Sequence, residues 1–290
     1  MKILAVLNPK SGVKSSKKQF IDALNIFSKH QNSVEVYITQ KQNDAYEYLT
    51  NRKVNYDVVC GFGGDGTINE IVNALMKKKK KPLIGYFPSG TMNDFGSNFN
   101  LDCAWSEIAE RICQGNYKEF DVGNYNGRYF NYVAAFGAFC DVPFSTDRSV
   151  KEAFGSMAYV FEAISKIPDI KPIDITVTCK GKKESYKALF GLVFSGNRVA
   201  GIELLDKKKG KINDGKFNVL IVEYVKSLLV DAPNILETLA RQDKFFHWYS
   251  SNEIEIEFRD KTVWTLDGEE AKFTNHVKIT NENKALKMLI

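Results

Sequence analysis

The chain has 290 residues, 44% of them hydrophobic and 26% charged, a composition typical of a globular protein with a buried core. No stretch approaches the roughly 18 consecutive apolar residues of a membrane-spanning helix, and the first apolar run, Ile3–Leu7, is too short for a secretory signal, so we expect a cytoplasmic protein. Five scattered cysteines without a C-x-x-C pair, and three histidines without H-E-x-x-H spacing, argue against a disulfide framework and a zinc or histidine-based metal centre.

The formal net charge of +5 is distributed unevenly along the chain. Lys77–Lys81 is a run of five lysines, and Lys207, Lys208, Lys209 and Lys211 form a second cluster. Such runs attract anionic surfaces, including acidic lipid headgroups, although a solvated helix end and a solvated loop are the simpler explanation. Because neither cluster is interleaved with aromatic residues, we expect no nucleic-acid partner.

Strand and helix patterns alternate through the first hundred residues. We expect strands at Ile3–Leu7, Val34–Thr39, Val58–Cys60 and Leu83–Phe87, and helices over Phe20–Phe27, Ala45–Leu49, Ile68–Leu75 and Trp105–Cys113. The run Val58–Cys60 is continuously apolar, as in strands that a parallel sheet buries on both faces. This alternation predicts βαβ units and a parallel sheet, in an α/β domain over residues 1–120.

The pattern changes near Asp121, where alternating polar and apolar residues replace it. The strongest short hairpin signal in the chain is Asn126-Gly127, which lies between the runs Val122–Tyr125 and Tyr129–Ala134. Further alternating runs lie at Ile173–Thr178, Leu189–Ser195, Phe217–Tyr224, Ile254–Phe258 and Thr262–Leu266, with helices expected over Ser156–Ile167 and Asp231–Gln242. The second half therefore predicts a mostly antiparallel β-domain that begins near residue 120.

The stretch Gly63-Gly64-Asp65-Gly66-Thr67 carries the most chemical information. It lies between a buried strand and a helix, where glycines let the backbone approach an anion and the first helical N–H groups offer donors. The negative charge of Asp65 does not suit a direct contact with phosphate. A carboxylate beside phosphates can instead hold Mg²⁺, directly or through water. The alternative is a tight turn in which Asp65 caps the helix; the following Asn69 and Glu70 favour the phosphate site.

Two further polar loops follow strands of the same predicted sheet. Asn8–Gly12 follows the first strand, and Pro88–Phe95 follows the fourth. Ligands of open parallel sheets bind outside the carboxyl ends of the strands, so three such loops can converge on one polyphosphate, although each alone suits an ordinary turn. The G-x-x-x-x-G-K-[ST] P-loop and a well-placed G-x-G-x-x-G fingerprint are absent, so we expect a phosphate site of another type.

Acidic residues close the antiparallel half of the chain. Leu266-Asp267-Gly268-Glu269 places two carboxylates around a glycine at a strand end, where either could act as a general base for an attacking hydroxyl. The alternative for this motif is an acidic hairpin turn. Asn213-Asp214-Gly215 also has the form of a hairpin turn, although a carboxylate beside exposed carbonyls can bind a hard cation.

Together, these motifs are similar to those of one known family. In this order along the chain, they resemble the motifs of the diacylglycerol kinase catalytic family, in particular its soluble bacterial lipid kinases. The motifs are Asn8–Gly12, Gly63–Glu70, Pro88–Phe95, Asp121-Val122-Gly123, Asp214-Gly215 and Leu266–Glu269. Sphingosine and ceramide kinases share the same plan. The resemblance spans essentially the whole chain. It implies a Rossmann-like, NAD kinase-like α/β domain over 1–120, to which Val277–Thr280 and the rest of 276–290 return, a β-sandwich domain over 121–275, and an active site between them.

The resemblance also implies a role for each matching residue. The nucleotide, ATP, would be contacted by Asn8, Pro9, Lys10, Ser11, Gly12, Thr39, Gly64, Asp65, Gly66, Thr67, Ile68, Asn69, Glu70 and Thr91. Asp65 and Asp94 would organise catalytic Mg²⁺ and water, and Glu269 would be the base, with Asp267 as the alternative. A structural metal would be held by Asp214 and the backbone carbonyls of Lys211 and Lys216. Gly196–Gly201 departs from the glycine-rich stretch that many members have there.

The resulting hypothesis is a kinase that transfers the γ-phosphoryl group of ATP to a lipid hydroxyl, with diacylglycerol as the first choice of acceptor. The lipid would be presented at a membrane surface, and the lysine clusters would provide peripheral contact with acidic headgroups. The alternatives are an NAD kinase, which shares the G-G-D-G motif, and a nucleotide or lipid sensor without catalysis. An exposed edge of the β-domain would also allow a homodimer.

Overall fold

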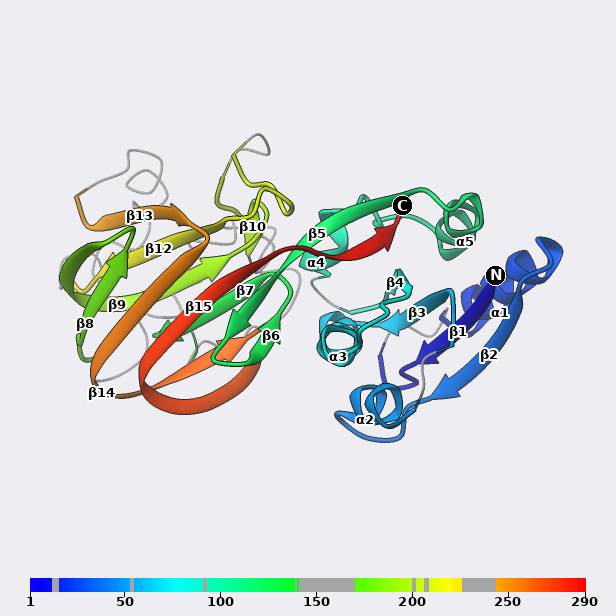
Figure 1. The fold of residues 1–290 in the computed structure, drawn as a ribbon, viewed down its shortest axis with the longest axis horizontal. Coiled ribbons are helices and arrows are strands. Elements are labelled where there is room, and N and C mark those ends of the chain that lie inside the picture. The colour runs from blue at the N-terminus through cyan, green and yellow to red at the C-terminus, as the bar shows by residue number, and fades with distance from the viewer. Residues whose placement is uncertain are drawn as a thin grey trace. The chain divides into compact units, whose positions relative to one another are not determined.

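The computed structural model describes residues 1–11, 16–52, 55–90, 93–138, 140, 170–199, 202–205, 209–225 and 244–290. The chain forms two compact units (Figure 1): Met1–Val122 with Ile212–Asp214 and Glu282–Ile290 in the first, and Gly123–Lys211 with Gly215–Asn281 in the second. The helices expected over Ser156–Ile167 and Asp231–Gln242, and two lysines of the second cluster, Lys207 and Lys208, lie outside the described residues.

A parallel sheet forms the centre of the first unit. Its strands are β1 (Lys2–Leu7), β2 (Ser33–Ile38), β3 (Val58–Gly63) and β4 (Leu83–Pro88). They pair in the order β2-β1-β3-β4, and each of these pairs is parallel. The end of β15 (Glu269–Leu289) joins β4, also in parallel, through Met288 and Ile84. The carboxyl ends of β1, β3 and β4 therefore meet at one edge of the sheet.

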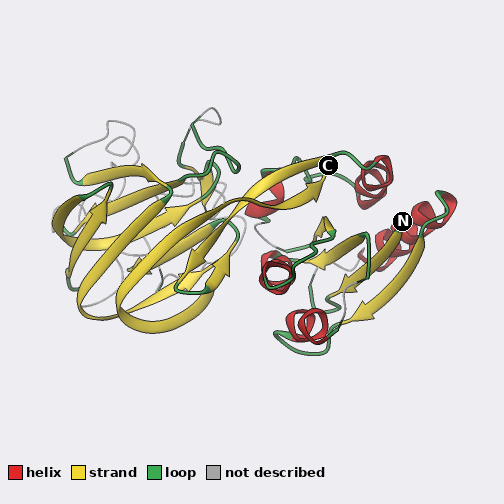
Figure 2. Cartoon of the chain, viewed as in Figure 1, coloured by secondary structure: helices red, strands yellow, loops and turns green. Residues whose placement is uncertain are grey.

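The described helices all belong to the first unit, as Figure 2 shows in red. They are α1 (Ser16–Lys29), α2 (Asp44–Asn51), α3 (Asp65–Met76), α4 (Asp94–Ser97) and α5 (Trp105–Gln114). α1 packs against α5, and α2 packs against α3. None of the described helices is long and apolar enough to cross a membrane.

An aromatic layer holds α1 and α5 on the sheet. Phe62 of β3 and Phe87 of β4 stack with their ring centroids 4.0 Å apart. Phe20 of α1 meets Phe62 edge-on at 4.8 Å, and Trp105 of α5 meets Phe62 at 5.4 Å. The Trp105 indole also donates a hydrogen bond to the Pro88 carbonyl at 3.1 Å. This layer fixes the ends of β3 and β4, from which two of the polar loops depart.

The second unit is built from antiparallel strands. They are β6 (Arg128–Phe130), β7 (Val133–Gly137), β8 (Ile173–Cys179), β9 (Lys182–Phe194), β10 (Arg198–Val199), β11 (Ile202–Glu203), β12 (Phe217–Glu223), β13 (Phe246–Ser251) and β14 (Glu253–Leu266). β5 (Tyr117–Tyr125) and β15 run from one unit into the other. The prediction of a mostly antiparallel second half is confirmed.

Two long strands close part of this unit into a ring. β9 pairs with β8 up to Ala188 and with β7 from Phe190 onward, and the change of partner coincides with a register shift at Leu189. β14 pairs with β8 around Ile256 and with β7 around Thr265, after a shift in its own register. Register shifts of this kind bend a strand. Strands β7, β9, β8 and β14 therefore form a closed circuit, which differs from the two separate sheets of the predicted β-sandwich.

Trp264 lies at the centre of the core of the second unit. It is fully buried and its ring lies 4.8 Å from Phe136, 5.3 Å from Tyr125 and 5.9 Å from Phe258. Burial of large aromatic side chains dominates the stability of such cores.

One sequence prediction about the C-terminal strand is wrong. Val277–Thr280 was expected to return to the first unit, but these residues pair with β14, where Thr280 lies opposite Glu253. They belong to the second unit, and only Glu282–Ile290 belongs to the first. Because β15 is one continuous strand of 21 residues, its alternating pattern does not mark the point at which it passes from one unit to the other.

Candidate functional site

Three loops of the first unit leave the parallel sheet at the same edge and are tied to one another. Asn8 follows β1, Gly64 follows β3, and Ser89 follows β4. The Asn8 side-chain amide donates to Thr67 Oγ1 at 3.2 Å, and the hydroxyls of Ser11 and Ser89 share a hydrogen bond of 2.8 Å. Loops from three different strands therefore form one surface.

Two glycines let the second and third of these loops touch along their backbones. A Cβ atom on Gly64 would lie 3.2 Å from the Cα of Gly90, and a Cβ atom on Gly90 would lie 2.9 Å from the Cα of Gly64. A side chain at either position would require the other loop to move. A surface made of backbone lets an anion such as a phosphate approach main-chain N–H groups closely.

Helix α3 begins at this surface. Gly64 is its N-cap residue, in an extended conformation, and Asp65 is its first residue. A Cβ atom on Gly63 would lie 2.3 Å from Thr67 Oγ1, so only glycine fits before this helix. The first N–H groups of a helix have no partners within it, and its dipole is positive at this end. With 12 residues, α3 is long enough for both effects to favour an anion here.

Asn93 shapes the loop after β4. Its φ of 51° is left-handed, its Oδ1 accepts the Gly90 N–H at 2.8 Å, and its Nδ2 donates to the Gly90 carbonyl at 2.9 Å. This closed ring places Asp94 at the first position of α4, where it is 1% exposed. Asp65 and Asp94 thus begin the helices that follow two neighbouring strands. Thr91 lies outside the described residues.

Glu70 has a structural role that the sequence did not reveal. Its two carboxylate oxygens accept backbone N–H groups at the start of α2, from Asn43 at 2.9 Å and from Ala45 at 3.0 Å. A carboxylate at a helix N-terminus stabilises it both as a hydrogen-bond acceptor and as a charge near the dipole. Glu70 therefore caps α2 from the neighbouring helix, and its contact with the nucleotide stays a prediction.

The other residues predicted to contact the nucleotide differ in exposure. Those with some exposure are Asn8, Pro9, Lys10, Ser11, Gly64, Asp65 and Gly66, whereas Thr39, Thr67, Ile68 and Asn69 are buried. Thr39 donates its hydroxyl to the Leu7 carbonyl at 3.3 Å. Gly12 lies outside the described residues. The first group is therefore accessible to a ligand, whereas the second group is enclosed within the fold.

The two residues predicted as alternative bases lie in the second unit, at the turn between β14 and β15. Asp267 is 6% exposed. Its Oδ2 accepts the Asn131 N–H at 2.6 Å, and its Oδ1 accepts those of Tyr132 and Val133, both at 3.0 Å. Asp267 and Gly268 are both left-handed, with φ values of 51° and 87°. Asp267 therefore anchors the loop between β6 and β7.

Glu269 is the more accessible carboxylate of the two. Its side chain is 23% exposed, and its Oε2 accepts a hydrogen bond from Arg128 Nη2 at 3.0 Å. Arg128 Nη1 also donates to the Glu270 carbonyl, at 2.8 Å. The two-point contact of Arg128 holds Glu269 in one orientation. Of the two candidates, Glu269 retains the greater access to a substrate hydroxyl.

The predicted structural metal site consists of Asp214 and the backbone carbonyls of Lys211 and Lys216. Asp214 belongs to the first unit, and Lys211 and Lys216 belong to the second. The Lys211 carbonyl accepts a hydrogen bond from the Gly196 N–H at 3.4 Å. Within the described part of the chain, no three His, Cys, Asp or Glu side chains gather as metal ligands. A metal here would depend on backbone carbonyls, and the site stays a prediction.

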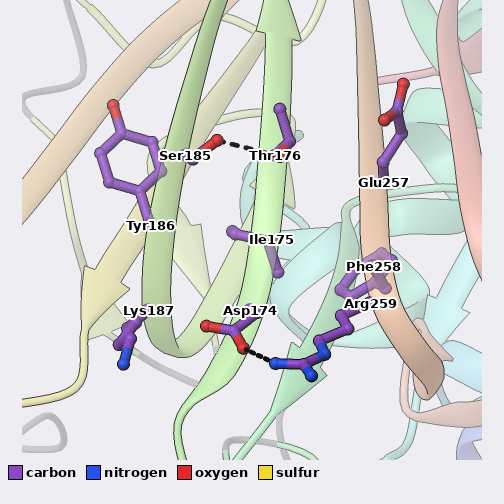
Figure 3. Close-up of a pocket in the computed structure, with 9 residues that line it drawn as sticks. All are labelled: Asp174, Ile175, Thr176, Ser185, Tyr186, Lys187, Glu257, Phe258 and Arg259. Atoms are coloured by element: carbon purple, nitrogen blue, oxygen red, sulfur yellow. Dashed lines mark hydrogen bonds and ion pairs between the residues drawn. The ribbon is translucent and has the colours of Figure 1, made fainter.

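A surface hollow of about 620 Å³ lies over β8, β9 and β14 of the second unit. Figure 3 shows its polar contacts: Asp174 and Arg259 form an ion pair at 3.4 Å, and the hydroxyls of Thr176 and Ser185 share a hydrogen bond of 3.0 Å. None of the predicted site residues lines this hollow, and several of its polar groups are paired with one another. Its size alone does not make it a candidate active site.

Sequence reasoning gave no individual role to three residues that shape these sites: Ser89, Asn93 and Arg128. Ser89 and Asn93 lie within the Pro88–Phe95 loop, and the asparagine before Asp94 was a usable signal because asparagine tolerates a left-handed conformation. Arg128 follows the Asn126-Gly127 turn. Its partner Glu269 lies 141 residues away in sequence, so no local pattern could have paired them.

Comparison with known proteins points to one family. The model of the "Diacylglycerol kinase catalytic domain" matches residues 2–125. The chain is 32% identical over 243 residues to a diacylglycerol kinase of Staphylococcus aureus (strain bovine RF122 / ET3-1), a match that covers 83% of this chain and 76% of the relative. It is also 32% identical to a diacylglycerol kinase of Staphylococcus saprophyticus subsp. saprophyticus, over 83% of this chain and 79% of the relative.

The fold agrees with this similarity. A crystal structure of a diacylglycerol kinase from Bacillus anthracis str. Sterne superimposes with a TM-score of 0.80 at 21% identity, over 99% of this chain and 96% of that chain. The predicted resemblance is therefore confirmed by sequence and by fold, and the chain belongs to the diacylglycerol kinase family.

Proposed function

We propose that the chain transfers the γ-phosphoryl group of ATP to the hydroxyl of diacylglycerol, giving phosphatidic acid and ADP. The first unit would act as a Rossmann-like nucleotide domain, and the second would act as a lipid-substrate domain. The observation that supports the nucleotide site best is the backbone contact of Gly64 with Gly90 at the start of α3. Diacylglycerol as the acceptor rests on the names of the similar proteins.

The carboxylates of the first unit suit Mg²⁺. This ion is usually bound through one or two carboxylates together with substrate phosphates, and it keeps several waters. Asp65 and Asp94 begin α3 and α4, beside the loops that suit phosphate, and they provide such a donor set without a closed protein cage. When bound, Mg²⁺ would neutralise charge on the phosphates during transfer. We propose that Asp65 and Asp94 hold it.

The acceptor hydroxyl needs a base, and we propose Glu269. As the lipid oxygen forms its bond to the γ-phosphorus, the bond from that phosphorus to the β,γ-bridging oxygen breaks and ADP departs. Glu269 accepts the hydroxyl proton, and Arg128 keeps the carboxylate in place. In this scheme Asp267 takes no proton, because its role is to fix the turn that carries Glu269.

The decisive experiment measures transfer of label from γ-labelled ATP to diacylglycerol in mixed micelles with Mg²⁺. We expect labelled phosphatidic acid, and a loss of at least about 100-fold in turnover for Asp65→Asn, since charge stabilisation contributes effects of this size. Near-normal turnover of Asp65→Asn would refute the role of Asp65. Label in added NAD but not in lipid would indicate an NAD kinase, and nucleotide binding without transfer to any acceptor would indicate a sensor.

A location in the cytoplasm with peripheral membrane contact is also part of the proposal, and the lysine run Lys77–Lys81 is its candidate surface. The structure assigns three of these lysines to contacts within the fold: Lys77 with the Tyr46 hydroxyl, Lys78 with the Thr50 carbonyl and Lys81 with the Ala285 carbonyl. We therefore propose that Lys79 and Lys80, both exposed, contact acidic headgroups. If Lys79→Glu/Lys80→Glu sediments with anionic vesicles as well as the parent protein does, this surface is not the contact.

A further inference from the structure

The hydroxyl of Tyr86 is buried without a hydrogen-bond partner among the described residues. Tyr86 lies in β4, is fully buried, and its Oη neither donates nor accepts a hydrogen bond within the described part of the chain. Most buried polar side-chain atoms are paired, because an unpaired one loses its bonds to water without replacement. An unpaired hydroxyl in the middle of the first unit therefore calls for a physical reason.

The register of the sheet places the Tyr86 ring on the face that carries α3. Gly61 of β3 lies opposite Tyr86 of β4, and residues in register point to the same face. A Cβ atom on Gly61 would lie 2.8 Å from Ile71 Cδ1, so this face is the one that α3 covers. Ile71 of α3 fills the space beside Gly61, and Tyr86 is the next residue of the sheet on this face.

Helix α4 contacts the same ring. A Cβ atom on Gly96 would lie 3.2 Å from Tyr86 Cε1, and the ring of Phe95 lies 6.3 Å from that of Tyr86. Tyr86 therefore packs against α4, which begins with Asp94, on the face of the sheet that α3, which begins with Asp65, covers.

Electrostatics agrees with this placement. Burial, and then the charge of the Asp65 carboxylate, hold the pKa of the Tyr86 hydroxyl well above its usual value. A tyrosine hydroxyl carries its proton at neutral pH in any environment, so it can donate a hydrogen bond. A protonated hydroxyl that senses a nearby carboxylate is a suitable hydrogen-bond donor to that carboxylate.

We propose that Tyr86 is a positioning residue for Asp65, whose carboxylate accepts a hydrogen bond from the Tyr86 hydroxyl when nucleotide and metal are bound. The inference rests on the proposed role of Asp65 in the nucleotide site. Tyr86 itself would touch neither the nucleotide nor the lipid. Its hydroxyl would fix the orientation of Asp65 from within the core, as second-layer groups do for ligand carboxylates in other metal sites.

The test is Tyr86→Phe, which removes only the hydroxyl. We expect kcat to fall about tenfold, the size that loss of one hydrogen bond to a charged group predicts. We also expect Mg²⁺ and ATP together to raise the Tm less than they do in the parent protein, because the bound state loses a stabilising contact. The Tm without ligands should stay the same or rise, since an unpaired buried hydroxyl costs stability.

Tyr125→Phe is the matched control. The Tyr125 hydroxyl is also buried without a hydrogen-bond partner among the described residues, but it lies in the core of the second unit. The Tyr125→Phe variant should change the Tm without ligands as Tyr86→Phe does. Its kcat and its ligand-induced rise in Tm should stay at the parent values. If Tyr86→Phe and Tyr125→Phe had the same kcat and the same ligand-induced rise in Tm, the proposal would be overturned.

A double-mutant cycle separates this inference from the proposed function. If Tyr86 acts through Asp65, Tyr86→Phe should have no further effect on the ligand-induced rise in Tm in an Asp65→Asn background. An additive loss in that rise would refute the coupling. Because the rise in Tm needs no lipid acceptor, it tests Tyr86 even if the protein proves inactive toward diacylglycerol.

Discussion

The two units build their candidate sites by opposite means. In the first unit, Gly64 and Gly90 touch because neither has a side chain, and the site is a surface of backbone. In the second unit, a single side chain, that of Asp267, gathers three backbone N–H groups and thereby holds the turn that carries Glu269. The first site requires the absence of side chains and the second requires a particular one, so different substitutions should break them.

The largest effect on stability should come from Asp267→Ala. It would leave three buried N–H groups without their acceptor, and we expect a loss of about 3–5 kcal/mol in the free energy of unfolding. Urea denaturation of the purified protein would measure it. The control is Glu269→Gln at the same turn, which should cost about 1 kcal/mol or less in stability, because its ion pair is partly exposed.

The activities of Asp267→Ala and Glu269→Gln sharpen the comparison between the two carboxylates. Glu269→Gln should lower kcat by about 100-fold or more, the range of a lost general base, in a protein that remains folded. If Asp267→Ala were as stable as the parent while Glu269→Gln kept its turnover, the roles assigned to the two carboxylates would have to be exchanged.

A smaller effect is expected from Gly90→Ala. The new Cβ would lie 2.9 Å from the Cα of Gly64, so the loops would have to separate, at a cost of about 1–3 kcal/mol. The affinity for ATP, measured by calorimetry, should fall as well. Gly64→Ala is the matched comparison. Its Cβ would lie 3.2 Å from the Cα of Gly90, so this variant should lose less stability than Gly90→Ala. The reverse order would contradict the proposed contact.

The smallest effect should come from Glu70→Gln. The glutamine side chain keeps one acceptor oxygen for the start of α2 but loses the charge and the second acceptor. We therefore expect a loss of about 1 kcal/mol in the free energy of unfolding. The Michaelis constant for ATP should be unchanged if Glu70 serves only as a cap. A large rise in that constant would support the contact with nucleotide that the sequence predicted.

Local patterns accounted for much of the first unit. The glycine-rich stretch after Cys60 and the polar loops after Leu7 and Phe87 were identified because glycine, asparagine and strand ends carry their own signals. The role of Glu70 could not be read in this way, because its partners Asn43 and Ala45 lie 27 and 25 residues earlier in the chain.

The second unit was less accessible to such reasoning. Alternating residues predicted the antiparallel strands, but the closure of the sheet depends on register shifts at Leu189 and after Glu257, which no local pattern marks. The anchor role of Asp267 depends on a loop more than 130 residues away in sequence. Both features arise from tertiary pairing.

The path of β15 has a consequence for biosynthesis. Residues 282–290 complete the sheet of the first unit by pairing with β4, although β1 to β4 are translated at the beginning. Until that late segment leaves the ribosome, the outer side of β4 lacks its strand partner, and an unpaired edge invites wrong pairing. We therefore expect a fragment that ends at Val122 to aggregate, and the first unit to mature only after the second unit has been synthesised.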